Sequence, residues 1–198
     1  MDKIKNKSAI LSLFLQKRFQ DALNLVERKL KLNSKNINLW LWKGFLLWIL
    51  KRNDEAIIYL NKAIELDPQN DVAFMYKANV YESQFKFNQA INCLNKALKI
   101  NPNSIPALIH KARSLQSLRK NKEAIKLYKI AINIHPCTNE WIDKAMIEYK
   151  IGKLKEAIKS LESFFAYMKE DDYNERKIKK LRRTLDEWKT ELKNNNAK

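Results

Sequence analysis

The residue types that most often carry out chemistry are few in this chain and lie far apart. The two histidines, His110 and His135, have no cysteine or carboxylate partner at ligand spacing. The two cysteines, Cys93 and Cys137, share no spacing typical of a metal or redox site. Zinc and general-base sites need several such groups at short, defined spacings. The pattern predicts no metal centre, and it favours structural histidines and reduced thiols, one in the core and one in a loop.

Carboxylates are the remaining groups that an enzyme could use as acids or bases. Glu55, Glu65, Glu82 and Asp143 are of this kind, but they are spread along the chain. Such spacing favours solvated or paired surface groups over an acid–base pair. The sequence also contains no nucleophile elbow, phosphate-binding loop or zinc-protease motif. We therefore expect a protein that is not an enzyme and that has no cofactor.

The secondary-structure elements that would position these side chains are indicated by a repeat in the amino-acid sequence. Small, large apolar and proline residues recur in rows with one common period, which is about 34 residues. The rows are Ala22, Ala56, Ala90, Ala124 and Ala157; Gly44, Ala78, Ala112 and Ala145; Trp40, Phe74, Leu108 and Trp141; and Pro68, Pro102 and Pro136. A fixed period of this length indicates a repeat architecture, which presents a long surface instead of closing a catalytic pocket.

Each row has a physical reason. Small residues let two helices approach closely, large apolar residues fill the layer between repeats, and proline falls where a helix must end. Apolar residues between the rows recur at helical spacing, as in Ala56, Leu60 and Ala63. Asp54 and Asn88 are predicted to start the second helices, because their side chains can accept hydrogen bonds from free backbone N–H groups.

These rows closely resemble the tetratricopeptide repeat, in which two antiparallel helices make up each period. The resemblance implies an all-α, right-handed α-solenoid of tandem helix-turn-helix repeats with a C-terminal capping helix. Five repeats are expected within residues 1–171, at about 3–36, 37–70, 71–104, 105–137 and 138–170. The first and last are degenerate; in the fifth, Glu148 stands where the others carry Leu47, Tyr81 and Leu115. Terminal repeats have one neighbour only, so degeneracy there is expected.

Residues 172–198 are expected to form a basic amphipathic capping helix and a frayed tail. The period stops after Asp171, and Ile178, Leu181, Leu185 and Trp188 then follow one apolar stripe. We predict the helix from Tyr173 to about Lys193 and fraying from Asn194 to Lys198.

The resemblance also implies where a ligand would bind, because the first helix of each repeat lines the concave face in this family. The expected lining is Leu41, Trp42, Phe45, Trp48 and Ile49; Met75, Tyr76, Asn79 and Ser83; Ile109, His110, Arg113, Gln116 and Ser117; and Ile142, Asp143, Met146 and Tyr149. The family's carboxylate clamp is not matched: Asn79 aligns with one clamp asparagine, but Met75, His110, Asn139 and Asp143 occupy the other positions.

An apolar, aromatic lining leaves three interpretations open. Its side chains can pack against the first repeat or a second copy of the chain, as in a homodimer through the groove. They can instead bind an apolar peptide or amphipathic helix of another protein, with Trp42 and Trp48 as anchors. They can also stack on nucleic-acid bases. We expect a protein–protein interaction module, a scaffold or adaptor, with the peptide segment in the groove.

The formal net charge of +17, from 39 lysines and arginines against 22 acids, is large for one small domain. Coding bias explains part of it, since Lys, Ile and Asn are enriched together. A field of this sign also attracts acidic proteins, RNA and anionic membranes. The densest cluster is a basic patch at Arg176, Lys177, Lys179, Lys180, Arg182 and Arg183. The alternative function is therefore electrostatic binding of RNA or a ribonucleoprotein, which would be sequence-tolerant because aromatic residues do not interleave the patch.

The N-terminus has three lysines before a short apolar run, a superficial likeness to a signal peptide. The run lacks a small-residue cleavage site and lies in register with the repeats, so we expect a cytoplasmic protein. The most apolar segment, residues 39–50, is too short to cross a bilayer.

Overall fold

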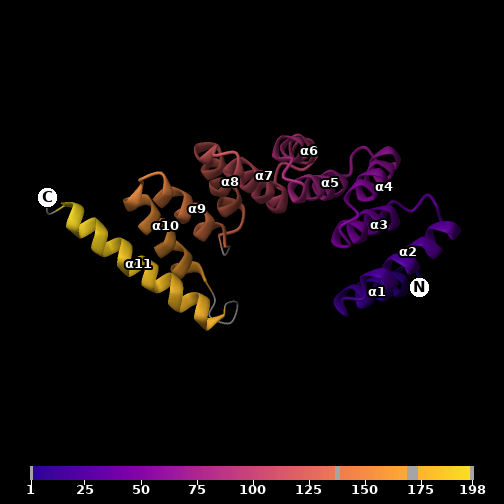
Figure 1. Cartoon of the computed structure of the whole chain (residues 1–198), viewed down its shortest axis with the longest axis horizontal. Coiled ribbons are helices and arrows are strands. Elements are labelled where there is room, and N and C mark those ends of the chain that lie inside the picture. Colours follow the sequence, from indigo (N-terminus) through magenta and orange to yellow (C-terminus); the bar gives the residue numbers. More distant parts are fainter. Residues whose placement is uncertain (1, 137–138, 169–173, 197–198) are drawn as a thin grey trace. The chain divides into compact units, whose positions relative to one another are not determined.

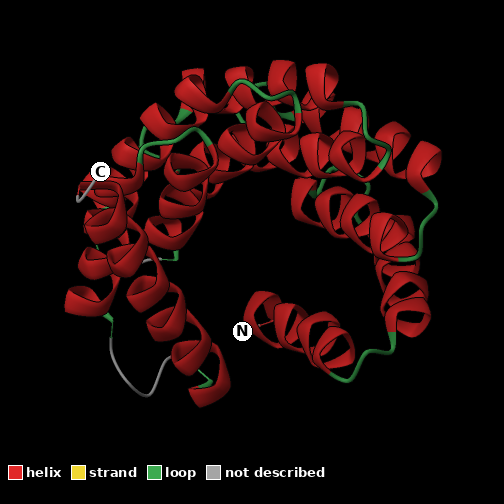
Figure 2. Cartoon of the chain, turned by 60° about the vertical axis from the view of Figure 1, so that its left-hand side comes forward, coloured by secondary structure: helices red, strands yellow, loops and turns green. Residues whose placement is uncertain are grey.

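The computed structural model describes residues 2–136, 139–168 and 174–196 and, for side chains, residues from Ala9 onward within these ranges. Its described residues form α-helices joined by short turns and contain no β-strand (Figure 2). The chain divides into two compact units, residues 1–107 and 108–198, and each is described by itself. The all-α class and the tandem helix-turn-helix pattern predicted from the sequence are confirmed.

Unit 1 contains three helix pairs and the start of α7 (Figure 1). The helices are α1 (Asp2–Leu15), α2 (Phe19–Leu32), α3 (Ile37–Ile49), α4 (Asn53–Leu66), α5 (Asp71–Ser83), α6 (Phe87–Ile100) and α7 (Ile105–Ser117). Helices that follow one another from α1 to α6 pack together, and α3 also contacts α5. The first helices of the second and third pairs therefore lie next to each other, and Phe14 of α1 contacts the rings of Trp42 and Phe45 on α3.

Unit 2 contains the rest of α7 and four further helices: α8 (Asn121–Ile134), α9 (Glu140–Lys150), α10 (Leu154–Tyr167) and α11 (Glu175–Asn196). α11 packs on α10 and buries Leu181, Leu185 and Trp188 in a core with Ala157 and Phe164. The apolar stripe of the capping helix is thus buried as predicted, while its helix extends beyond the expected end, to Asn196. Tyr173 and the last two residues of the predicted tail lie outside the described residues.

The alanine row occupies the interior, as its period predicts. All five alanines that recur from Ala22 to Ala157 are fully buried, and so is the row from Ala78 to Ala145. At Gly44 the helices are closer still, because an added Cβ would lie 2.6 Å from Leu60 Cγ. The same row that tolerates alanine elsewhere therefore requires glycine between α3 and α4.

The helix ends fall where the prolines indicate. α4, α6 and α8 end two residues before Pro68, Pro102 and Pro136. The residue in front of Pro68, Asp67, is extended, and so is His135 in front of Pro136. This conformation is the one that a following proline imposes.

The starts of the second helices differ from the prediction. α4 begins at Asn53 and α6 at Phe87, with Arg52 and Lys86 at their N-caps and no side-chain cap on either. Asp54 and Asn88 are thus inside the first turn, not at the cap. The reason is the preceding turn, in which Lys51 and Phe85 adopt left-handed backbone and the next residue bonds back to the first helix. The chain enters the second helix directly from this turn.

Candidate protein-binding face

Unit 1 brings together five aromatic side chains from the first helices of its three pairs. Phe45 of α3 lies at its centre: its ring centroid is 5.5 Å from Phe14, 5.9 Å from Trp42, 5.7 Å from Trp48 and 5.1 Å from Tyr76. Phe14 comes from α1 and Tyr76 from α5. All five rings are half-buried, so each leaves part of its surface in contact with solvent. We call these five residues the aromatic face.

The periodic spacing positions this face. Three of its residues lie within two turns of α3, and α1 and α5 supply one ring each because the first helices of the pairs are neighbours. Phe14 was absent from the residues predicted from the sequence. The signal that could have found it is its place one full period before Trp48, in the same row.

Two predicted lining residues are more deeply placed than a binding residue requires. Leu41 is 7% exposed and belongs to the core of unit 1, and Asn79 is 8% exposed. Met75 is half-buried against the cluster formed by Phe74 and its neighbours on α6. Leu41 and Asn79 therefore offer little surface to a partner.

The aromatic face carries no charged side chain. Burial raises the pKa of the Tyr76 phenol further above neutral pH. Within the described residues, the Trp48 Nε1 donor and the Asn79 amide oxygen have no hydrogen-bond partner. The face therefore combines apolar ring surface with polar groups that are neutral.

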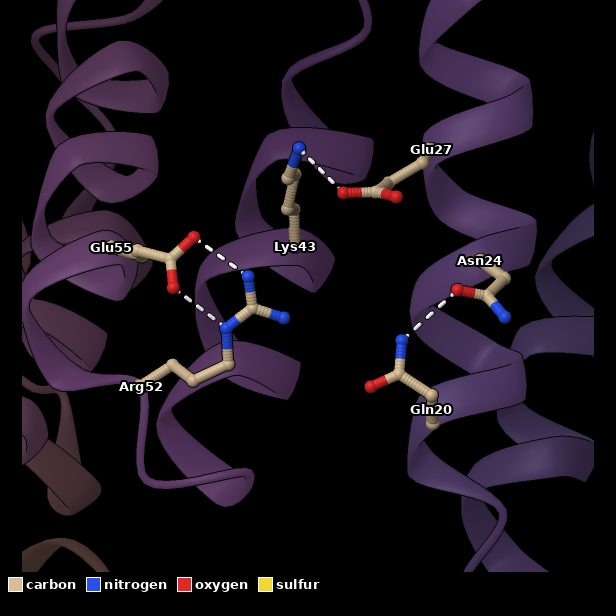
Figure 3. A network of polar contacts seen from close by, with 6 residues as sticks. All are labelled: Gln20, Asn24, Glu27, Lys43, Arg52 and Glu55. Carbon is tan, nitrogen blue, oxygen red and sulfur yellow. Dashed lines mark hydrogen bonds and ion pairs between the residues drawn. The ribbon is translucent and has the colours of Figure 1, made fainter.

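A row of lysines at equivalent positions of successive repeats lies between neighbouring helix pairs. These lysines were not predicted from the sequence. Lys43 of α3 forms an ion pair with Glu27 of α2 at 2.8 Å (Figure 3). Its ammonium group also stands 3.9 Å above the Tyr59 ring. Its counterpart in the next repeat, Lys77, donates to Asn61 of α4 at 2.7 Å. Both lysines connect a first helix to the second helix of the preceding pair, so this row fixes how neighbouring pairs dock.

Of the carboxylates predicted as solvated or paired surface groups, Glu55, Glu65 and Asp143 form ion pairs. Glu55 accepts two hydrogen bonds of 2.7 Å from Arg52 (Figure 3), which lower the pKa of its carboxyl group. Glu65 pairs with Lys62 at 2.8 Å. None of these contacts holds a carboxylate against a second acid, and the described residues include no cluster of three His, Cys, Asp or Glu side chains that could hold a metal ion.

The predicted residues of unit 2 are arranged differently. Arg113 of α7 forms an ion pair with Asp143 of α9 at 3.0 Å, so its charge is neutralised within the unit. Ile109, His110 and Ile142 are half-buried, and Met146 is 37% exposed. The described part of unit 2 shows no aromatic cluster on α7 and α9 comparable to the one on α1, α3 and α5.

The basic patch lies on the first half of α11, and three of its six cations are used inside unit 2. Lys177 donates to Asn139 at 3.1 Å, Arg182 stands 5.5 Å from the Phe165 ring, and Arg183 pairs with Glu187 at 3.0 Å. Arg176, Lys179 and Lys180 are exposed, because the buried stripe occupies the opposite side of the helix. No helix in the described part of the chain is long and apolar enough to span a membrane.

The polar residues of the degenerate fifth repeat form a buried cluster. Lys144 pairs with Glu148 at 2.9 Å, and Ser160 donates to Glu148 at 2.6 Å and accepts from Lys144. Their exposures are 7%, 3% and 1%. The charge of Glu148, which replaces an apolar side chain of the row, is therefore neutralised by Lys144, and its carboxylate also accepts a hydrogen bond from Ser160.

The fold has close counterparts among solved structures. MamA shares 20% identity, with 79% of this chain and 92% of that chain covered and a TM-score of 0.70. The tetratricopeptide repeat protein TTC0263 of Thermus thermophilus shares 18% identity over 93% of this chain and 97% of that one, at the same TM-score. The Naa15/Naa10 structure bound to HypK-THB shares 18% identity over 84% of this chain and 25% of that one, with a TM-score of 0.63. At these identities the likeness shows the fold alone.

Sequence comparison gives a more specific result. No curated protein matches the chain. The family described as the tetratricopeptide repeat protein 21 N-terminal ARM repeat matches residues 3–128, which is well over half of the sequence and covers every helix that carries the aromatic face. The tandem helix pairs, the buried alanine row and this match lead to one conclusion: the chain belongs to the family of the tetratricopeptide repeat protein 21 N-terminal ARM repeat.

Proposed function

We propose that this protein is a non-enzymatic scaffold that binds an apolar peptide segment or an amphipathic helix of another protein on its aromatic face. The observation that carries the proposal is the contact of five aromatic rings from three successive first helices, each ring half-buried. Aromatic side chains of this kind dominate the free energy of many protein interfaces. The repeat fold is also typical of protein–protein interaction modules.

The proposed contact surface centres on Trp42 and Trp48. Their rings are large and rigid, so they add apolar contact area at a small cost in side-chain entropy. Tyr76, whose ring centroid lies 5.1 Å from that of Phe45, belongs to the same surface. In unit 1 the surface also includes Phe45 and Met75, with a small contribution from Leu41 and Asn79, which are 7% and 8% exposed. In unit 2, considered by itself, Ile109, His110, Arg113, Ile142 and Met146 are proposed as a separate contact surface.

The experiment is a selection from a random library of short linear peptides on the immobilised full chain. Binding of the enriched peptides is then measured by calorimetry against wild type and the double variant Trp42→Ala/Trp48→Ala. Losing two anchors is expected to weaken binding by about 2 kcal/mol or more, roughly thirtyfold in Kd. Circular dichroism must show unchanged helicity in the variant.

Phe85→Ala is the matched control, because Phe85 is an exposed aromatic residue in a turn, outside the aromatic face. Enriched peptides that bind the double variant as tightly as wild type would disprove the proposal. A mass that rises with concentration, and that the double variant lowers, would show instead that a second copy of the chain occupies the face.

A second function, electrostatic binding of RNA or a ribonucleoprotein, is favoured by the outward position of Arg176, Lys179 and Lys180 on α11. It predicts binding whose logarithm falls with the logarithm of salt concentration, by about 0.7–0.9 for each phosphate contact. Charge reversal at Lys179, Lys180, Arg182 and Arg183 should weaken RNA binding and leave selected peptides bound. An unchanged affinity for RNA in that variant would exclude the patch.

A further inference from the structure

We infer that the turns between the paired helices of unit 1 form a second binding surface, which docks on an anionic lipid bilayer. The surface comprises Leu15, Lys17, Lys51, Phe85 and Lys86, and we call it the basic turn edge. It is separate from the aromatic face and does not depend on the function proposed there.

The first observation is the placement of Phe85. Its side chain is 80% exposed and its backbone has a φ of 58°, in the left-handed region that bulky residues rarely adopt. Its only ring contact in the described structure is with Phe87, at 6.2 Å. The side chain is thus a large apolar group in solvent with little packing in return, while its backbone conformation is the one that Lys17 and Lys51 adopt in the equivalent turns.

The second observation is that the three turns are built alike. Lys17, Lys51 and Phe85 occupy the same left-handed position, with φ values of 58°, 63° and 58°. In each turn the next residue donates its backbone N–H to the carbonyl five residues earlier, as in Lys86 to Tyr81. Because the helix pairs pack in succession, equivalent turns lie at the same end of neighbouring pairs. Gln84 at the third turn bonds across to Asp54, just after the second.

The third observation is the chemistry that these turns expose. Leu15, at the first turn, is 71% exposed, so apolar side chains project at both ends of the edge. The cations between them are Lys17, Lys51 and Lys86, which form no ion pair with any described residue, whereas Arg18 and Arg52 are paired with Asp21 and Glu55. The edge therefore presents unpaired lysines flanked by a leucine and a phenylalanine.

An anionic bilayer accepts this combination better than other partners do. Leucine and phenylalanine both gain by entering the boundary between headgroups and acyl chains, while lysine side chains extend toward anionic headgroups. A nucleic-acid base could stack on Phe85, but a nucleic acid offers no such contact to Leu15. The lysines need no fixed geometry to meet a charged surface, since each acts as a point charge on a flexible stem.

The test is cosedimentation of the full chain with vesicles of phosphatidylcholine alone or of phosphatidylcholine with phosphatidylserine. Wild type should bind the anionic vesicles, and salt should weaken the binding. Leu15→Ser/Phe85→Ser should weaken it by about tenfold or more, because two apolar contacts are lost. Lys17→Glu/Lys51→Glu/Lys86→Glu should abolish it.

Matched controls come from the opposite ends of the same helices. Leu32→Ser removes a leucine that is 89% exposed at the end of α2, and Lys31→Glu/Lys35→Glu/Lys99→Glu makes the same change in net charge. Both controls should bind as wild type. The inference is overturned if the wild-type protein does not bind anionic vesicles, or if the control variants lose vesicle binding as much as the edge variants do. It is also overturned if the edge variants lose affinity for a polyuridine RNA while their vesicle binding is unchanged.

Discussion

At the scale of single residues, the turns inside the helix pairs show where the chain accepts strain. Lys17, Lys51, Phe85 and Arg119 adopt left-handed backbone, and Gly152 takes the equivalent position in the last pair. Only glycine adopts this conformation without a steric cost from its Cβ atom. In four of these five turns, glycine at the left-handed position would therefore raise the free energy of unfolding.

Replacing Arg119 by glycine should stabilise the protein by about 0.5–1 kcal/mol, because relief of the Cβ clash exceeds the added backbone entropy of the unfolded chain. Urea denaturation followed by circular dichroism would measure the change. Lys120→Gly is the matched control, since Lys120 has a φ of −82° and gains no relief. That control should change stability little, because Lys120 is the N-cap residue of α8 and glycine is tolerated at this position. An Arg119→Gly variant no more stable than the control would contradict the strain argument.

At the scale of elements, the contact between α9 and α10 contains a buried polar cluster beside its apolar core. Lys144, Glu148 and Ser160 satisfy one another with almost no exposure to water. Such a cluster costs desolvation free energy, which its internal contacts offset only while every member is present.

Glu148→Leu should therefore destabilise unit 2 by about 3–5 kcal/mol, although other repeats carry leucine at this position, because Lys144 is left charged and unpaired. The double change Lys144→Met/Glu148→Leu removes both charges and should restore stability to near the wild-type value. Thermal unfolding of the three proteins provides the measurement. A double variant as unstable as the single one would show that packing, and not the unpaired charge, causes the loss.

At the scale of the whole molecule, stability in a repeat array is a sum of repeat terms and nearest-neighbour contacts. α11 makes the last of these contacts. Trp188 is 5% exposed and stacks on Tyr149 with ring centroids 4.6 Å apart. A destabilising substitution in this contact should consequently lower the stability of only those helices that α11 covers.

We expect Trp188→Ala to cost about 3–5 kcal/mol in the unfolding of unit 2. Hydrogen exchange resolved by mass spectrometry should show faster exchange in α9, α10 and α11, with α3 to α6 of unit 1 near their wild-type rates. Lys189→Ala, which removes an exposed ion pair between α11 and Glu162, is the control and should change little. Uniformly faster exchange along the whole chain would contradict a nearest-neighbour array.

The class of fold could be predicted from the residues alone, because each position of a repeat requires a side chain of a given size. Ala22 and its counterparts had to be small to fit between two helices, and Pro68 and its counterparts had to follow helix ends, so spacing alone predicted both. The apolar stripe of α11 was predictable for the same reason. Trp42, Phe45, Trp48 and Tyr76 were named as groove residues through the resemblance to the tetratricopeptide repeat, and their role in binding stays a prediction.

The contacts between side chains of different helices could not be predicted in this way. The joining of Phe14 to the aromatic face, the pairing of Arg113 with Asp143, and the compensation of Glu148 by Lys144 and Ser160 all depend on rotamers and helix docking. The helix starts were missed for a related reason: the left-handed turn at Lys51 and Phe85 sets them, and side-chain propensity alone does not indicate it. Periodicity specifies which side of a helix faces inward, whereas a contact requires the partner's position in space.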